Sequence, residues 1–270
     1  MPELPEVETY IREIAVELRG RQVQGGRVLW PRTVADLSPE AFLHGMRGRR
    51  FVDFGRRGKY MLLGLDNGQS LIVHLRMTGE LRVESTNLPL DKHARLVLDL
   101  DGGLRLRFSD QRKFGRMWLV ADPQSVLHRL GPEPLAEDFT PDLFGAALAG
   151  RKASIKALLL DQSIVAGVGN IYADEALFLA RIHPTRKGGS LSAPEVAALH
   201  QAVRDVLTQG IEMRGSSLQN YTPPTGEKGS FQDLHKVFRR TGQPCPVCGC
   251  PIERMKLAQR STHFCPHCQD

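Results

Sequence analysis

The first six residues, Met-Pro-Glu-Leu-Pro-Glu, contain an unusual set of reactive groups. Pro2 is small enough for the initiator methionine to be removed, which would leave a secondary amine at the chain terminus. When such an amine attacks an aldehyde-like carbon it forms an iminium ion, which stays cationic and draws electrons. Glu3 and Glu6 are close enough in sequence to move the protons that this chemistry needs. The alternative is that Pro2 and Pro5 only stiffen the start of a helix.

Four of the five cysteines form two Cys-x2-Cys pairs separated by 16 residues. This spacing is typical of four thiolates bound to one zinc ion. Four sulfur ligands leave no position for a substrate, so we expect one structural Zn²⁺ and not a catalytic ion. The predicted ligands are Cys245, Cys248, Cys265 and Cys268. Cys250 is expected to be a bystander, although a shift in register would make it a ligand, and a redox role for the pairs is the weaker alternative.

The stretch between the cysteine pairs is expected to form a β-hairpin with residues 255–260 at its tip. Lys256 and Arg260 would then lie on a hairpin held by zinc. Basic side chains in this position suggest contact with DNA, although a protein partner is also possible.

Basic side chains are clustered in the sequence. The chain has 36 Lys and Arg against 30 Asp and Glu, a net charge of +6 and a pI near 9.2. Residues 47–59 contain six basic side chains and one acidic one, and residues 228–260 contain seven against two. Such clusters favour a polyanionic partner, most simply nucleic acid, although they could be solvated faces. We see no secretory signal and no apolar run of membrane-spanning length, which predicts a cytoplasmic protein with reduced cysteines.

The hydrophobic pattern changes along the chain. Residues 5–19 have one apolar helical face. From about 22 to 120, short strands alternate with turn signals such as Asp66-Asn67-Gly68, which predicts an antiparallel sandwich or barrel. Helical periodicity dominates from about 124, and Ser192–Glu195 is typical of a capping box. The predicted fold class is α+β, with an N-terminal helix and a β-sandwich followed by a helical domain and a zinc-binding hairpin.

Two short helices, at 155–160 and 171–182, flank the glycine-containing turn Asp161–Asn170. Gly167 and Gly169 would let the backbone approach a ligand closely. Asn170 opens the second helix, whose free N–H groups and positive end would face an anion such as phosphate. An ordinary helical hairpin with glycines in its turn is an equal alternative.

Six segments occur in an order that resembles the bacterial formamidopyrimidine-DNA glycosylase family, over essentially all of the chain. They are PELPEVET at the start, RRGKY at 56–60, HLRMTG at 74–79, DQRKFGR at 110–116, GVGNIYADEAL at 167–177 and QRSTHFCPHCQ at 259–269. The resemblance implies a helix–two-turn–helix in the helical domain. It predicts a catalytic sandwich domain at 1–121, a linker at 122–134, a DNA-binding helical domain at 135–232 with a lesion loop at 214–233, and a zinc finger at 233–270.

The resemblance also implies an activity and roles for individual residues. The expected protein is a monomeric bacterial repair enzyme that excises oxidised purines, chiefly 8-oxoguanine opposite cytosine and formamidopyrimidines, from double-stranded DNA. It would then nick the strand by β,δ-elimination. Pro2 would be the nucleophile on the sugar C1′, Glu3 the general acid/base, and Lys59 would contact the abasic phosphate or sugar.

Further residues match the family's DNA contacts. After the damaged base is flipped out, Met77, Arg112 and Phe114 would fill the gap in the stack. Without the resemblance, Met77 and Phe114 would be taken as core residues and His74 as an ordinary strand histidine. The residues expected to contact the DNA backbone are His74, Lys156, Asn170 and Arg260.

The long polar segment after residue 213 is expected to recognise the flipped base. The residues implied in recognition are Glu6, Ser216, Leu218, Gln219, Asn220 and Tyr221. Pro223 and Pro224 depart from the usual family loop, and a proline has no N–H to donate. Lesion preference is therefore the property that this departure affects most.

Three other functions fit parts of the sequence. A glycosylase of the related Nei type would prefer oxidised pyrimidines, but Leu4 and the Met77, Arg112 and Phe114 set favour the purine branch. A non-catalytic zinc-ribbon DNA-binding protein fits the composition but leaves the Pro2–Glu3 pair unexplained. A proline-dependent tautomerase would leave the zinc site and the basic clusters without a role.

Overall fold

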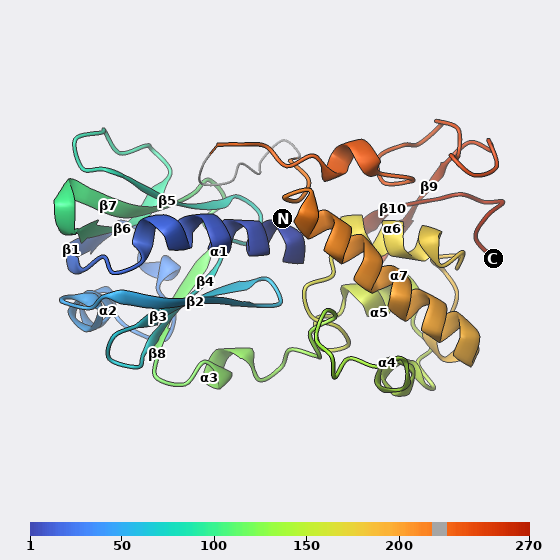
Figure 1. Cartoon of the computed structure of the whole chain (residues 1–270), viewed down its shortest axis with the longest axis horizontal. Helices are drawn as coiled ribbons and strands as arrows, with labels where there is room; N and C mark the ends of the chain where they lie inside the picture. The colour runs from blue at the N-terminus through green and yellow to red at the C-terminus, as the bar shows by residue number, and fades with distance from the viewer. Residues whose placement is uncertain (218–225) are drawn as a thin grey trace. The chain divides into compact units, whose positions relative to one another are not determined.

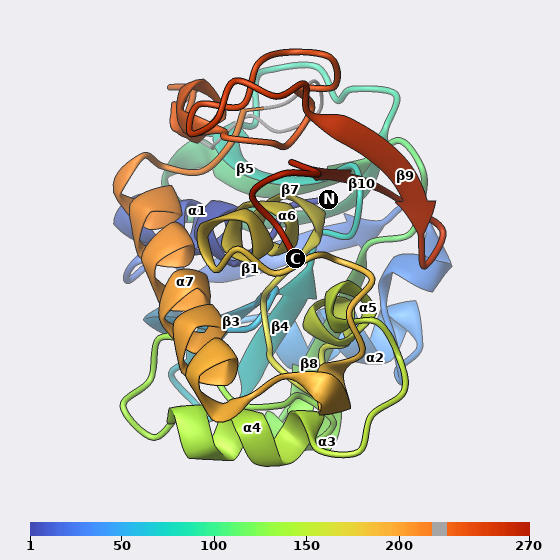
Figure 2. The same ribbon diagram turned by 90° about the vertical axis from the view of Figure 1, so that its right-hand side faces the viewer.

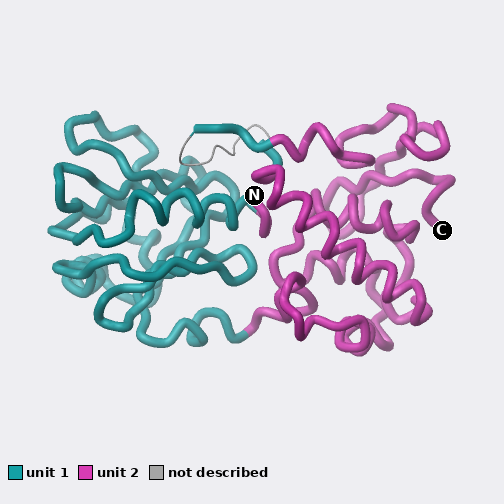
Figure 3. The backbone as a smooth tube through the Cα atoms, viewed as in Figure 1, with its two compact units in different colours: residues 1–2, 6–128, 216–229 teal, residues 3–5, 129–215, 230–270 magenta. Residues whose placement is uncertain are grey.

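The computed structural model describes residues 1–217 and 226–270. These residues form two compact units, each built from more than one stretch of chain (Figure 3). Unit 1 contains residues 1–2, 6–128 and 216–229, and unit 2 contains residues 3–5, 129–215 and 230–270. The predicted domain boundaries differ in detail from these units and stay a prediction.

Unit 1 is a β-sandwich of two antiparallel sheets, each with four strands among the described residues. The first sheet has the order β1-β6-β7-β5 and the second the order β2-β3-β4-β8. The strands are β1 (Val23–Val28), β2 (Phe51–Arg57), β3 (Tyr60–Leu65), β4 (Ser70–His74), β5 (Gly79–Ser85), β6 (Ala94–Leu100), β7 (Leu104–Asp110) and β8 (Arg116–Val120). The predicted antiparallel sandwich is confirmed.

Helix α1 (Leu4–Leu18) lies between the two sheets (Figure 1). Its apolar side chains recur every three or four residues, so they share one face and enter the sandwich core. The buried members of this face are Val7, Tyr10, Ile11, Ile14 and Leu18. The helix at the chain start is therefore an integral part of the core of unit 1.

The other helices of unit 1 are short. They are η1 (Pro31–Thr33), α2 (Pro39–Met46), η2 (Asp101–Gly103) and α3 (Gln124–Leu127). Ser38 caps α2 by accepting a hydrogen bond from Ala41 N, and Pro39 occupies the first helical position.

Unit 2 is mainly helical and ends in a two-stranded hairpin (Figure 2). Its elements are α4 (Pro141–Leu148), α5 (Ile155–Leu160), α6 (Asn170–Leu179), η3 (Gly188–Ser190), α7 (Ala193–Glu212), η4 (Phe231–Leu234), β9 (Glu253–Leu257) and β10 (Arg260–Phe264). The predicted capping box of α7 is present, because Ser192 and Glu195 exchange side-chain and backbone hydrogen bonds. The described part of the chain has no helix that is both long and apolar enough to cross a membrane.

The hairpin corrects one prediction. The tip was expected to run from Met255 to Arg260, but only Ala258 and Gln259 form the turn. Both have positive φ, at 47° and 58°, which matches the twist of a tight two-residue hairpin. Arg260 is therefore the first residue of β10 and is held by strand pairing with Leu257.

Candidate active site and nucleic-acid interface

Glu3 lies at the N-terminus of α6. Its Oε1 accepts a hydrogen bond from Ile171 N at 3.0 Å, and Oε2 lies 3.4 Å from Tyr172 N. The first N–H groups of a helix have no partner within the helix, and they favour a carboxylate. Glu3 is almost fully buried, with 3% of its surface exposed. The carboxylate is thus fixed by groups more than 160 residues away in sequence.

This arrangement corrects the prediction that the glycine turn presents free N–H groups to a phosphate. At least two of those N–H groups are used by the protein's own carboxylate. A Cβ on Gly169 would collide with the Glu3 carboxyl group, and a Cβ on Gly167 would collide with the Leu4 side chain. Gly167 also has φ +85°, and its carbonyl accepts a hydrogen bond from Leu4 N at 3.0 Å. The close approach predicted for the two glycines therefore holds the chain's own N-terminal residues.

Glu6 occupies a separate position, in unit 1. It is buried, and its Oε1 accepts a hydrogen bond from Ser216 N at 2.8 Å. A hydrogen bond therefore joins two residues to which the family resemblance gives a role in lesion recognition. The other four, Leu218, Gln219, Asn220 and Tyr221, lie outside the described residues, as do Pro223 and Pro224.

Lys59 belongs to a two-residue turn between β2 and β3. Gly58, the first turn residue, has φ +55°, a conformation that glycine adopts without strain. Lys59 is itself buried, with 5% of its surface exposed. Pro2 is also buried. The Pro2 nitrogen is an amide while Met1 is attached, so its nucleophilicity depends on removal of Met1.

His74 is buried at the end of β4. Burial lowers its pKa to about 3, and the positive charges of Arg76 and Lys59 act in the same direction. Its Nδ1 accepts a hydrogen bond from Arg76 N at 3.0 Å, so the neutral ring carries its proton on Nε2. His74 can therefore donate one hydrogen bond without carrying a charge. Its ring packs edge-on against Tyr60.

The predicted gap-filling residues lie in two loops of unit 1. Phe114 has 49% of its surface exposed, so the alternative that it is a core residue is excluded. The Arg112 guanidinium lies over the Phe114 ring, 4.9 Å from its centroid. Arg112 also reaches the sulfur of Met77, which is half-buried. The three residues named from the sequence therefore form one contiguous cluster, which we call the wedge.

Lys156 differs from its expected role as a DNA contact. Its side chain is fully buried, and Nζ lies 2.5 Å from Asp174 Oδ1. Burial lowers the pKa of Lys156, and the Asp174 carboxylate opposes this effect. Nζ also donates to the Ser261 carbonyl at 3.0 Å and to Thr262 Oγ1 at 2.8 Å. Because an ammonium is costly to bury without partners, it lies where the protein supplies them.

Asn170 donates to the same Ser261 carbonyl, also at 3.0 Å. Its Oδ1 is buried without a hydrogen-bond partner in the described part of the chain. The neighbouring residue in β10 is Arg260, whose side chain is exposed. Lys156 and Asn170 therefore fix the strand from which Arg260 projects.

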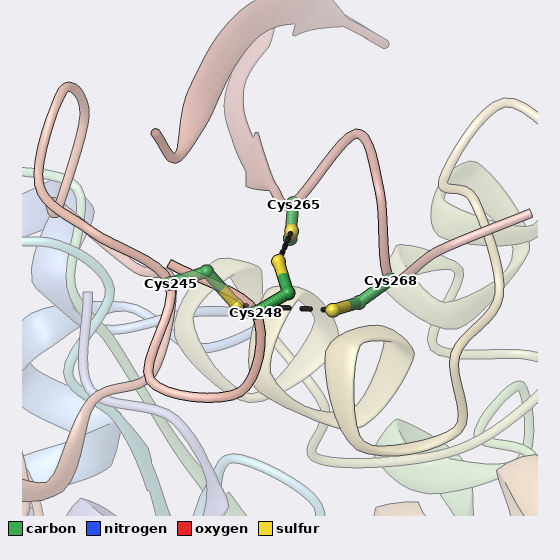
Figure 4. Close-up of side chains that lie close together, drawn as sticks. All are labelled: Cys245, Cys248, Cys265 and Cys268. Carbon is green, nitrogen blue, oxygen red and sulfur yellow. Dashed lines mark hydrogen bonds between the residues drawn. The ribbon is translucent and has the colours of Figure 1, made fainter. Parts of the chain in front are cut away.

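The four predicted zinc ligands converge at the end of unit 2 (Figure 4). All four sulfur atoms lie within 4.8 Å of one another. Two of the separations are 3.9 Å, between Cys245 and Cys268, and 3.5 Å, between Cys248 and Cys265. Ligands at a typical Zn–S distance in a tetrahedron would be about 3.8 Å apart. The residues therefore fit a structural zinc ion, and Cys250 is not part of the set.

Three buried acids were not identified from the sequence. Asp110 accepts hydrogen bonds in the wedge loop, and Asp174 and Glu175 lie on α6. The Glu175 carboxylate accepts from the backbone N–H groups of residues 236–238, although burial raises its pKa. One signal was available: two adjacent acids inside an otherwise apolar helix are seldom buried unless they have partners.

Family models match most of the chain. The N-terminal domain of formamidopyrimidine-DNA glycosylase matches residues 1–117, and the helix–two-turn–helix domain of the same enzyme matches residues 130–222. A zinc finger found in these glycosylases and in isoleucyl-tRNA synthetases matches residues 242–270.

Relatives match over the whole length. The formamidopyrimidine-DNA glycosylase of Herpetosiphon aurantiacus is 51% identical, with both chains fully covered. That of Chloroflexus aurantiacus is 49% identical over all of this chain and 98% of its own. A Lactococcus lactis glycosylase mutant, solved with DNA containing a formamidopyrimidine-dG, has a TM-score of 0.94 at 36% identity with full coverage of both chains. A MutM complex with DNA containing carbocyclic 8-oxoguanine has a TM-score of 0.93 at 36% identity, again with full coverage of both chains.

The fold and the cysteine site define a zinc-finger DNA-repair glycosylase. The chain belongs to the formamidopyrimidine-DNA glycosylase family.

Proposed function

We propose that the protein is a bifunctional glycosylase and abasic-site lyase that excises oxidised purines from double-stranded DNA. Its principal substrates would be 8-oxoguanine opposite cytosine and formamidopyrimidines. The observation that carries this proposal is the wedge, in which the exposed Phe114 ring already packs against Arg112. A protein that removes a base from the stack needs groups to fill the gap, and this cluster offers an aromatic plane and a hydrogen-bond donor. Solved relatives in complexes with formamidopyrimidine and 8-oxoguanine DNA support the same substrates.

In the proposed reaction, Pro2 acts after Met1 has been removed. Its secondary amine attacks C1′, the glycosidic bond breaks, and the damaged base leaves with the proton that the amine gives up. Glu3 supplies a proton to the sugar ring oxygen and the ring opens, so that an iminium ion joins Pro2 to C1′. Loss of a proton from C2′ then expels the 3′ phosphate, and a second elimination expels the 5′ phosphate. Lys59 would hold the abasic phosphate or sugar.

The remaining site residues are proposed to contact DNA. His74, Asn170 and Arg260 would bind phosphates that flank the lesion, with His74 donating from Nε2. The hydrogen bond between Glu6 and Ser216 would hold the start of the lesion loop. The loop residues Leu218, Gln219, Asn220 and Tyr221 would contact the flipped nucleobase. We further propose that the protein acts as a monomer in the bacterial cytoplasm. Size-exclusion chromatography of the free protein tests the oligomeric state.

Borohydride trapping tests the chemistry. An iminium intermediate can be reduced, so wild-type protein with 8-oxoguanine duplex should form a covalent complex that survives denaturation. Pro2→Gly should trap weakly or not at all, because glycine offers only a primary amine. Pro5→Gly, with the terminal proline retained, is the matched control and should still trap. Absence of any trapped wild-type species would remove the lyase proposal.

A lesion panel tests the substrate. Duplexes with 8-oxoguanine or a formamidopyrimidine opposite cytosine should be cut faster than a duplex with thymine glycol. A tenfold preference for thymine glycol would instead place the protein with the oxidised-pyrimidine glycosylases.

A further inference from the structure

The loop that carries the wedge is organised around the carboxylate of Asp110, the last residue of β7. Asp110 is almost completely buried, with 1% of its surface exposed. Its Oδ2 accepts hydrogen bonds from Phe114 N and Gly115 N, both at 2.7 Å. Its Oδ1 accepts from Arg112 N at 3.1 Å and from the Thr78 hydroxyl. A single carboxylate thus receives four hydrogen bonds from neutral donors.

These donors come from both segments of the wedge. Thr78 follows Met77 directly, whereas the three N–H groups belong to the loop that carries Arg112 and Phe114. Arg112 N also lies 3.1 Å from Thr78 Oγ1, which closes the network. Asp110 therefore joins the two segments at their base.

Other contacts restrict the backbone of the same loop. A Cβ on Gly115 would collide with the Phe108 ring, so the chain must pass close to the core there. Lys113 has a positive φ of 61°, which costs energy in a residue other than glycine. Its ammonium lies over the Trp30 ring at 4.2 Å, which helps to hold that conformation.

We propose that Asp110 is a positioning residue that builds the wedge before DNA binds. It does not contact the substrate. It fixes the backbone N–H groups of residues 112, 114 and 115, so that the Arg112 and Phe114 side chains leave the loop in the directions required for filling the gap. A preorganised wedge loses less conformational entropy on binding than a mobile loop does. This inference rests on the proposed function, because it assumes that the wedge enters DNA.

The first experiment measures Asp110→Asn on lesion duplexes. An asparagine of the same shape presents an NH₂ group to some of the N–H donors that the carboxylate accepts. We expect kcat/KM for 8-oxoguanine opposite cytosine to fall about tenfold, the lower end of the scale for one lost hydrogen bond to a charged group. The preference for cytosine over adenine opposite the lesion should narrow as well, because Arg112 is no longer held. Asp66→Asn, in the exposed β3–β4 turn, is the matched control and should leave both quantities unchanged.

The second experiment separates positioning from folding. Asp110→Asn is introduced into a protein that already carries Arg112→Ala and Phe114→Ala, and single-turnover excision is compared in the two backgrounds. If Asp110 acts through the wedge, its effect disappears when the wedge is absent. An equal loss in both backgrounds would overturn the proposal, and so would an unchanged rate and opposite-base preference in Asp110→Asn. If the asparagine variant does not fold, Thr78→Val can be used instead, because it removes one of the four donors. An equal loss in both backgrounds, or an unchanged rate and opposite-base preference, would again overturn the proposal. A wild-type protein that excises no lesion would instead contradict the proposed function, independently of Asp110.

Discussion

Two buried aspartates, one in each unit, support surface groups in different ways. Asp110 in unit 1 receives only neutral donors, and its three N–H donors lie within five residues of it. Asp174 in unit 2 pairs with the Lys156 ammonium and also accepts from the His263 amide and ring nitrogen, at 3.0 and 3.1 Å. The first aspartate organises a local loop, whereas the second binds a group 89 positions away from it in the chain.

The difference matters for energetics. A local loop can rearrange at limited cost when its anchor is changed, because few other elements depend on it. The Asp174 cluster includes a fully buried ion pair, and removal of one partner leaves an uncompensated charge in the interior. Changes near Asp110 should therefore affect function more than stability, and changes near Asp174 should affect both.

Zinc removal should have the largest effect on unit 2. A strong chelator removes the zinc ion that the four thiolates share. The cysteine knuckles and the β9–β10 hairpin then lose their fixed geometry. DNA binding should fall by at least tenfold. The sandwich of unit 1 should keep its strand signal in circular dichroism, and retention of full DNA affinity by the zinc-free protein would contradict the assignment.

Lys156→Met should be the most damaging single substitution at the Asp174 cluster. It leaves the carboxylate buried without its ammonium partner, and we expect a loss of about 3–5 kcal/mol in the free energy of unfolding. Denaturant titration measures this loss. The double variant Lys156→Met with Asp174→Leu should recover part of it, because neither charge remains. A double variant less stable than the single one would show that hydrogen bonds, and not charge burial, dominate.

The acid sensitivity of unit 1 should depend on His74. Its pKa in the folded protein is about 3, below the ordinary value of 6.5. Below pH 6.5 the unfolded chain binds a proton that the folded state excludes, so stability falls as pH decreases from 6.5 towards 3. The slope from one such group is at most about 1.4 kcal/mol per pH unit. In denaturant titrations, His74→Gln should flatten the plot of the free energy of unfolding against pH. His128→Gln, at an exposed histidine of the same unit, should leave this plot unchanged.

Arg260→Ala should produce the smallest of these effects. Its side chain is exposed, so its loss should leave the free energy of unfolding nearly unchanged. If Arg260 binds a phosphate, the slope of log DNA affinity against log salt concentration should be less steep by about one unit in the variant. Gln259→Ala, in the adjacent turn, serves as the control. An unchanged slope would count against the phosphate contact.

The features predicted best from the sequence are those set by local spacing. The zinc ligands follow from two Cys-x2-Cys pairs, and helix α1 follows from apolar residues three or four positions apart. The hairpin tip was misplaced because Ala258 and Gln259 have no turn signature, although the pairing of β9 with β10 requires a two-residue turn there. Sequence periodicity does not report such a register.

Contacts between distant residues were harder to predict. The family resemblance implied that Lys156 contacts DNA, and only the folded structure shows Asp174 beside it. The positive end of α6 was expected to face an anion such as phosphate, with an ordinary helical hairpin as an equal alternative. The identity of that anion, Glu3, depends on a chain reversal that no local pattern contains.

The hydrogen bonds of the first residues to later parts of the chain have a consequence for synthesis on the ribosome. Glu3 binds the amides of Ile171 and Tyr172, and Glu6 binds the amide of Ser216. Neither carboxylate can reach its final partner until more than half of the chain has been translated. Much of the sandwich can form earlier, since domains generally fold as units during synthesis. A nascent or truncated chain that lacks these later segments would therefore present its first residues without the hydrogen bonds that fix Glu3 and Glu6 in the folded protein.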